Sequence, residues 1–118
     1  MKLENNMYVR TKRDGIGKII SLSIGEENEC CFIELAKRRT GIKEHNIVKT
    51  SHNIIDLIEV GDYVNGYKIT SIEEGNRKNR WVYAEDKDGY LIESFAPKKI
   101  KSIVTKEQFE AMAYRIGE

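Results

Sequence analysis

The 118-residue sequence predicts an all-β protein built from two similar halves packed as one body, with an α-helix at its C-terminus. Three observations support this prediction. Short runs of β-branched and aromatic residues are separated by polar turn dipeptides, which is typical of antiparallel strands. One such pattern occurs twice along the chain. The apolar spacing of residues 105–118 then changes from the strand period to the helix period.

The repeated pattern is a hairpin whose second strand is closely matched in the two copies. Residues 17–22 are Gly-Lys-Ile-Ile-Ser-Leu, and residues 67–72 are Tyr-Lys-Ile-Thr-Ser-Ile. A Tyr-Val pair lies in the preceding strand of each copy, at Tyr8 and again at Tyr63. These correspondences predict that the two segments occupy equivalent places in two copies of one β unit.

A turn dipeptide precedes each of these strands, Asp14-Gly15 in the first copy and Asn65-Gly66 in the second. Both dipeptides favour two-residue type I′ turns, because this turn needs positive φ at both central positions, which Asp, Asn and Gly tolerate. We therefore expect tight hairpins at corresponding places in the two copies.

Each copy holds short strands in roughly 45 residues, which is the size and rhythm of an SH3-like barrel around a small core. The segment between the copies is apolar and lacks the Gly and Ser richness of a flexible tether. We therefore expect two tandem SH3-like barrels packed as one body. The expected boundaries are residues 1–50 for the first unit, 51–61 for a packed connector, 62–104 for the second unit and 105–118 for the helix.

The C-terminal helix is predicted from its start signal and from its apolar face. Thr105 and Gln108 have the spacing of a capping box, in which each side chain satisfies a backbone N–H of the other residue. The apolar residues that follow have helical spacing and share one face: Phe109, Met112, Ala113 and Ile116.

The composition is that of a globular protein without broad affinity for nucleic acid. Hydrophobic residues make up 40% and charged residues 33%, and 20 basic against 19 acidic residues give a formal net charge of +1. Because non-specific nucleic-acid binding needs several unopposed phosphate contacts, it would require a local patch. The chain has no apolar run of membrane-spanning length and no signal-peptide pattern, so we expect a cytoplasmic protein that contacts no membrane.

No catalytic or metal motif is recognisable. Cys30 and Cys31 are adjacent and lack Cys-x-x-Cys spacing, so we expect reduced strand cysteines, one in the core and one facing out. His45 and His52 are expected on the surface, and Ser51 lacks the Gly-x-Ser-x-Gly pattern of a nucleophile elbow. We therefore predict a protein that is not an enzyme and that has no metal site and no cofactor.

Two basic clusters are the candidate binding residues. The first cluster, in the second hairpin of the first copy, is Lys37, Arg38 and Arg39. The second cluster, which includes two aromatic residues, is Arg77, Lys78, Arg80, Trp81 and Tyr83.

Strand alternation determines whether Trp81 is available for binding. If Val82 and Ala84 point into the core, Trp81 and Tyr83 face outward beside Arg80. Guanidinium groups next to exposed aromatic rings suit phosphates and stacked bases. The alternative is that Trp81 lies in the core, as tryptophan usually does, and that the basic residues only keep the turns soluble.

Two parts of the sequence resemble known proteins. Residues 8–20 are similar to the opening hairpin of SH3-like and KOW-type small barrels, which often bind RNA or other proteins. Residues 53–66 and 102–110 resemble small proteins of phages and prophages in low-GC Gram-positive bacteria, and this likeness spans roughly residues 7–112. Phage proteins of this size frequently inhibit host immunity, as anti-CRISPR proteins or as sponges for nucleotide signals.

This resemblance implies a non-enzymatic phage accessory protein that binds and inhibits a defence component in the bacterial cytoplasm. A host protein is the expected partner. The alternatives are a sponge that sequesters a nucleotide immune signal and a KOW-like adaptor that binds RNA, each through the basic and aromatic residues. Formation of a homo-oligomer is left open.

Overall fold

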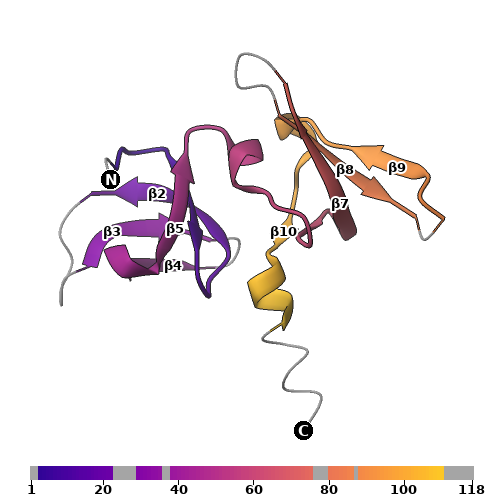
Figure 1. Cartoon of the computed structure of the whole chain (residues 1–118). Coiled ribbons are helices and arrows are strands. Elements are labelled where there is room, and N and C mark those ends of the chain that lie inside the picture. Colours follow the sequence, from indigo (N-terminus) through magenta and orange to yellow (C-terminus); the bar gives the residue numbers. More distant parts are fainter. Residues whose placement is uncertain (1–2, 23–28, 36–37, 76–79, 87, 111–118) are drawn as a thin grey trace, which may run out of the picture.

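The computed structural model describes residues 3–22, 29–35, 38–75, 80–86 and 88–110, and this part of the chain is mostly β-strand (Figure 1). Two antiparallel sheets of five strands each lie beside one another, and one short helix follows them. The prediction of a mostly β protein with a C-terminal helix is therefore confirmed.

The elements of the two halves follow one another in the same order. The first half contains β1 (Tyr8–Thr11), β2 (Ile16–Ser21), β3 (Glu29–Glu34), β4 (Arg39–Lys43), the 3-10 helix η2 (Glu44–Asn46) and β5 (Ile47–Ser51). A connecting 3-10 helix, η3 (Ile54–Leu57), leads to the second half. The second half contains β6 (Tyr63–Val64), β7 (Tyr67–Glu74), β8 (Arg80–Glu85), β9 (Leu91–Ser94), the 3-10 helix η5 (Pro97–Lys99) and β10 (Ile103–Val104).

The two sheets also share their strand order and their register. The order is β4-β3-β2-β1-β5 in the first sheet and β9-β8-β7-β6-β10 in the second. The paired residues of the first hairpins are Tyr8 with Lys18 and Val9 with Gly17, and Tyr63 with Lys68 and Val64 with Tyr67. A register shift follows Ile19 in one sheet and Ile69 in the other. Strands β2 and β7, which contain Gly17 and Tyr67, thus occupy equivalent places in the two sheets.

Closed SH3-like barrels, which the sequence predicted, are not confirmed. In the part of the chain that the structure describes, β4 and β5 end the first sheet without pairing to each other, and β9 and β10 do the same in the second. A single 3-10 turn reverses the chain before β5 and before β10. Strands β6 and β10 have only two residues each, so the second sheet has few hydrogen-bonding groups with which to close. Both sheets are therefore open.

The two predicted type I′ turns turn out to be different. Asn65 has φ 51° and Gly66 has φ 86°, as this turn requires. In the first hairpin only Gly15 has positive φ, at 81°, so a type I′ turn at Asp14-Gly15 is wrong. The loop there is wider, and Thr11 closes it because its N–H and its hydroxyl both donate to the Gly15 carbonyl, at 2.9 and 2.8 Å.

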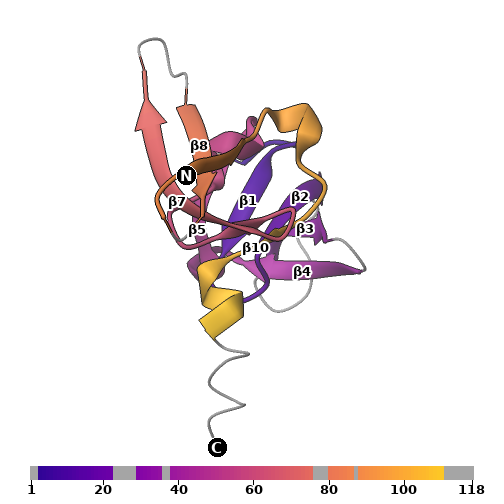
Figure 2. The same ribbon diagram turned by 90° about the vertical axis from the view of Figure 1, so that its right-hand side faces the viewer.

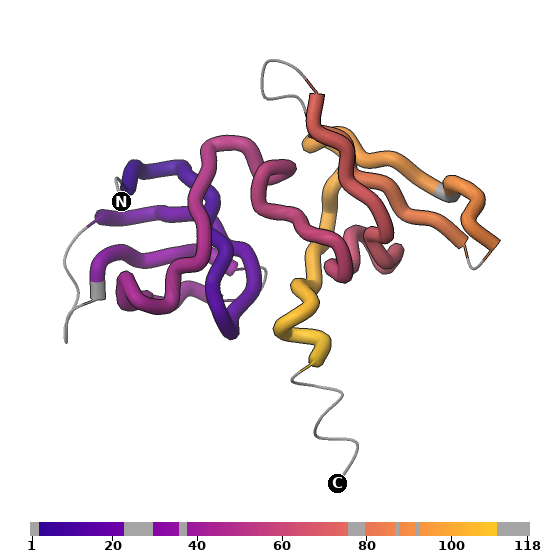
Figure 3. Tube along the Cα trace, in the orientation of Figure 1, coloured from indigo at the N-terminus to yellow at the C-terminus, as the bar shows by residue number. Residues whose placement is uncertain are grey.

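Each sheet has its own apolar core. The first core contains Val9, Ile19, Cys31, Ile33, Ile42 and Ile47, and the second contains Ile55, Ile58, Val64, Ile69, Val82, Ala84 and Phe95. Ile55 and Ile58 belong to the connector between the sheets, which runs between the two halves in Figure 3. The connector therefore packs into the second core through these two residues. The unit boundaries expected from the sequence remain predictions.

The C-terminal helix begins with the predicted capping box and follows β10 directly (Figure 2). The Thr105 N–H donates to Gln108 Oε1 at 3.0 Å, and the Gln108 N–H donates to Thr105 Oγ1 at 3.3 Å. The ring of Phe109 lies 4.8 Å from that of Tyr63, which anchors the first turn to β6. The other residues of the predicted apolar face, Met112, Ala113 and Ile116, lie outside the described residues. Among the described helices, none has the length and apolar character needed to cross a membrane.

Candidate functional site

Strand β8 presents aromatic residues on the outer face of the second sheet. Val82 and Ala84 are buried in the second core, whereas Trp81 is 44% exposed and Tyr83 is half-buried. Of the two orientations that the sequence left open for Trp81, the structure therefore shows the outward one, and Trp81 is not a core residue. Only Ser71 and Ser94 lie directly across from Tyr83 on the neighbouring strands, so small side chains flank its ring.

The apolar part of this face continues onto the edge strand β9. Glu85 lies on the same face of β8 as Trp81 and Tyr83, because side chains two positions apart on a strand point the same way. Leu91 pairs with Glu85, and cross-strand partners share a face. Leu91 is 57% exposed, and the preceding Tyr90 is 72% exposed. We call Trp81, Tyr83 and Leu91 the aromatic face. Leu91 was not predicted to belong to this face, because its orientation depends on a register shift between β8 and β9 that has no local signal.

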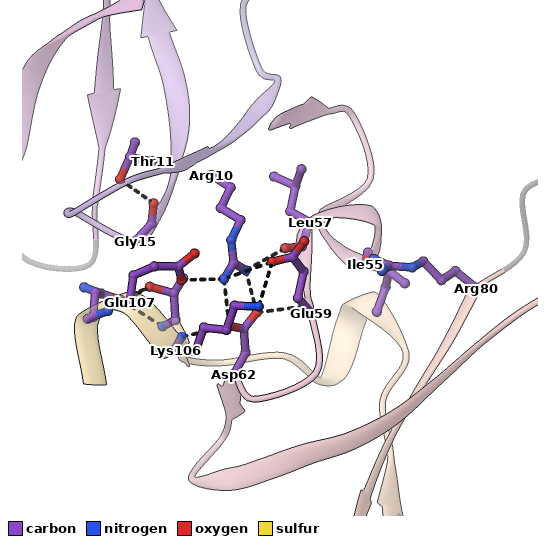
Figure 4. Close-up of polar contacts among 12 residues, drawn as sticks. Arg10, Thr11, Gly15, Ile55, Leu57, Glu59, Asp62, Arg80, Lys106 and Glu107 are labelled. Carbon is purple, nitrogen blue, oxygen red and sulfur yellow. Dashed lines mark hydrogen bonds and ion pairs between the residues drawn. The ribbon is translucent and has the colours of Figure 1, made fainter. Parts of the chain in front are cut away.

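Arg80 does not share this face. Arg80 lies on the same face of β8 as Val82, two positions later, and its Nη1 donates to the Ile55 carbonyl in η3 at 2.8 Å (Figure 4). Its Nε lies 3.4 Å from Glu74 Oε1, and its side chain is only 13% exposed. The guanidinium therefore joins the second sheet to the connector, instead of standing beside the outward-facing rings. Arg77 and Lys78, the other basic residues of this cluster, lie outside the described residues.

Two pockets flank the Arg80 side chain. One has a volume of about 400 Å³, and its lining includes Trp81, Arg80, Ile55, Phe95 and Pro97. We call it the Trp81 pocket. The other, of about 280 Å³, is lined by charged and polar residues of both halves: Lys49, Thr50, Ser51, Asp56, Glu74 and Arg80. The lining of the Trp81 pocket thus includes more apolar residues than that of the other pocket, and an exposed aromatic ring forms part of its wall.

The first basic cluster is neutralised by neighbouring acids where the structure describes it. Arg38 lies 2.6 Å from Asp14, and Arg39 lies 3.1 Å from Glu34. Both arginines are exposed, so these ion pairs contribute little stability, but they do offset the positive charge that the cluster was predicted to present. Lys37 lies outside the described residues.

A buried ion pair among the described residues was not predicted from the sequence. Arg10 of β1 is 1% exposed and Asp62, before β6, is 0% exposed, and they form a bidentate pair at 2.5 and 2.8 Å (Figure 4). Arg10 also donates to the Leu57 carbonyl at 2.9 Å and to Glu107 at 2.7 Å. Burial by itself lowers the pKa of Arg10, but the hydrogen bond and charge of Asp62, together with Glu107 and Glu59, raise it overall.

Asp62 connects this pair to the connector and to the helix. Besides Arg10, its carboxylate accepts the Glu59 N–H at 2.7 Å and the Lys106 N–H at 2.9 Å. The second of these contacts satisfies a free N–H in the first turn of the helix. The two apolar cores are therefore linked through a buried ion pair, which we call the Arg10–Asp62 junction; among the described residues, Arg10 Nε is its one buried side-chain nitrogen without a hydrogen-bond partner. Its role is structural.

The residues that were considered as nucleophiles and bases do not form a catalytic arrangement. Burial, with Cys30 beside it, raises the pKa of Cys31 to about 12, so its thiol is inert near neutral pH. His45 and His52 are exposed, as predicted, and His52 contacts Glu4 at 2.8 Å. Ser51 donates to Asp56 at 2.6 Å. Among the described residues no histidine hydrogen-bonds to Ser51 or to a cysteine, and no acidic, histidine or cysteine cluster has metal-binding geometry.

The chain matches no protein-family model, no curated protein and no solved structure. The interpretation of the aromatic face and of the Trp81 pocket therefore depends on their own geometry.

Proposed function

We propose that this chain is a non-enzymatic binding protein that docks on another protein through Trp81 and the Trp81 pocket. One observation carries the proposal: the only tryptophan is 44% exposed and forms part of the wall of a pocket of about 400 Å³ together with Phe95 and Pro97. Tryptophan is enriched among the residues that dominate protein interfaces, particularly next to pockets that a partner side chain can fill. Tyr83 and Leu91 extend the apolar contact across the sheet.

The charges around this surface favour a protein over a nucleotide. Glu73 lies directly opposite Trp81, and Glu85 follows Tyr83 on the same face. Arg80, the described cation nearest to the rings in sequence, is hydrogen-bonded to Ile55 and largely buried. Phosphate groups would meet carboxylates here, so a nucleotide sponge or an RNA adaptor that uses these residues is disfavoured. A protein partner with an apolar side chain and basic neighbours would be complementary.

The biological setting of the proposal rests on sequence resemblance. Residues 53–66 and 102–110 resemble phage and prophage proteins, so the proposed partner is a component of host defence and the proposed action is inhibition in the bacterial cytoplasm. A binding protein of this type needs no cofactor. It acts by covering a surface that the defence protein requires.

The proposal is tested by expressing the chain in bacteria that each carry one defence system and measuring phage plating efficiency. A system that the chain inhibits is then purified, and its affinity for the chain is measured with and without Trp81→Ala. We expect a loss of roughly 30-fold or more, which corresponds to about 2 kcal/mol at a central tryptophan.

The matched control is Val48→Ala, because Val48 is 46% exposed but lies on the first sheet. It should leave affinity and inhibition unchanged. Equal affinity of the Trp81→Ala variant and the unmodified chain would contradict the proposed surface. A chain that inhibits none of the systems tested would contradict the proposed role in defence.

A further inference from the structure

A second surface in the second half has a different chemistry. A hollow of about 650 Å³ lies beside the β6–β7 turn and is lined by Asn65, Lys98, Lys99, Lys101 and Ser102. All three lysines are exposed, and no acidic residue lines the hollow. Within the described residues, none of the three forms an ion pair. We call this site the lysine hollow.

The backbone that carries these lysines is held in place by one side chain. The Asn65 side chain donates from Nδ2 to the Lys99 carbonyl at 2.7 Å, and its Oδ1 accepts the N–H groups of Lys101 at 2.7 Å and Ser102 at 3.0 Å. The Asn65 N–H also donates to the Ser102 carbonyl at 2.9 Å. The three ammonium groups therefore project from a fixed segment, which lowers the conformational entropy lost when an anion binds between them.

The first half provides an internal comparison for this charge. The corresponding 3-10 helix before the last strand, η2, consists of Glu44, His45 and Asn46. The same turn is thus built without lysine, so the fold does not require the positive charge. The lysines of η5 need another explanation.

We infer that the lysine hollow binds the phosphate groups of a single-stranded nucleic acid. Lysine ammonium groups act as point charges for phosphate, and three of them without acidic neighbours form the local patch that a chain of net charge +1 requires. Tyr67, 42% exposed, follows the same turn, and its ring lies 6.4 Å from that of Phe95, three positions before Lys98. Tyr67 does not line the hollow itself, but it is two residues from Asn65, which does. An exposed ring so close in sequence to a basic surface suits an unpaired base, which can stack on it.

This inference goes beyond the proposed function and is independent of it. The two surfaces are nevertheless adjacent along the chain, because residues 94–97 line the Trp81 pocket and the lysine hollow is lined by Lys98, Lys99, Lys101 and Ser102. A protein partner that itself carries a single-stranded nucleic acid would meet both surfaces at once.

The test measures binding of a fluorescently labelled twelve-nucleotide single-stranded RNA and of its DNA counterpart by anisotropy, between 50 and 200 mM NaCl. With three phosphate contacts, we expect a slope of about −2.1 in the plot of log affinity against log salt concentration, or roughly 18-fold weaker binding across this range. Replacing Lys98, Lys99 and Lys101 together by Gln should remove most of the binding and flatten the slope. Tyr67→Ala should weaken binding by roughly 5-fold or more and leave the slope unchanged.

The matched control replaces three exposed lysines elsewhere, Lys12, Lys18 and Lys49, by Gln, which gives the same change in net charge. Circular dichroism and melting of each variant confirm that it is folded. The inference is overturned if the chain does not bind either oligonucleotide at 50 mM NaCl, or if the control variant loses as much affinity as the hollow variant. It is also overturned if a poly-glutamate peptide of equal charge binds as tightly, since the hollow would then recognise acidic protein. None of these outcomes affects the Trp81 surface, whose test uses a protein partner.

Discussion

The outer faces of the two sheets differ although the sheets are built in the same way. In the first sheet Phe32 pairs with Ser21 and Gly41, and in the second Tyr83 pairs with Ser71 and Ser94. One aromatic residue between two small ones is therefore common to both sheets.

The residue two positions before this aromatic residue differs between the sheets. It is a half-buried Cys30 in the first sheet and an exposed Trp81 in the second. The 3-10 helices differ as well, since η5 carries two lysines where η2 carries a glutamate. The repeated elements act as a scaffold, and the exposed groups proposed to bind partners are concentrated in the second half.

The largest expected effect is at the junction between the halves. Asp62→Ala would leave Arg10 buried without its main partner, which costs about 3–5 kcal/mol, a large part of the stability of a small protein. Urea unfolding should show this loss. The matched control, Glu34→Ala, removes an exposed ion pair with Arg39 and should cost less than about 1 kcal/mol.

A second variant separates the charge from the packing of the junction. Replacing the pair together, Arg10→Met with Asp62→Leu, should recover much of the stability lost in Asp62→Ala, because no buried charge remains unpaired. A double variant as unstable as Asp62→Ala would show that the junction depends on hydrogen bonds to the connector and helix. The raised pKa of Arg10 makes its contribution fully present below the pKa of arginine in the unfolded chain. The contribution is lost only as pH rises through the folded pKa, in strong alkali.

The two hairpin turns provide a matched pair with a smaller effect. Gly15 and Gly66 both have positive φ, so an alanine at either costs about 1–2 kcal/mol in the backbone. At Gly15 the added Cβ would also lie 2.4 Å from Gln108 Oε1, whereas nothing lies within 4 Å at Gly66. Gly15→Ala should therefore displace Gln108 and weaken the helix cap, at a further cost of about 1 kcal/mol. Equal shifts in the urea midpoint for the two variants would contradict the contact between this turn and the helix.

The smallest expected change in stability is for a substitution in the first core. Cys31 occupies the place that Val82 has in the second sheet, because each lies directly before the aromatic residue of its strand. Cys31→Val exchanges a buried apolar side chain for a slightly larger one, so we expect it to change the free energy of unfolding by less than about 1.5 kcal/mol. In the unmodified chain, the pKa of about 12 should keep Cys31 unreactive toward iodoacetamide at pH 8 unless the protein unfolds. Rapid alkylation of Cys31 in the folded chain, measured by mass spectrometry, would contradict its burial.

Local sequence patterns were sufficient for the features that depend on neighbouring residues. The hairpin at Asn65-Gly66 and the capping box at Thr105 follow from turn chemistry and side-chain hydrogen bonding. Strand alternation left two orientations open for Trp81, and the structure shows the outward one. The internal repeat was also visible, because two segments with similar patterns form the same hairpin. The turn and the cap depend on residues a few positions apart, and the repeat is found by comparing two short segments of the sequence.

The tertiary structure alone decided the features that depend on distant residues. Arg10 and Asp62 are 52 positions apart, and Arg80 turns to a carbonyl 25 positions earlier, so no periodicity predicts either contact. The lysine hollow likewise depends on Asn65 reaching a segment 34 positions later. Closure of the sheets was predicted from strand number and length, but it depends on curvature and on the pairing of the last strands. Such contacts form only once the chain has folded, because burying these polar groups costs free energy unless partners from distant parts of the sequence are brought to them.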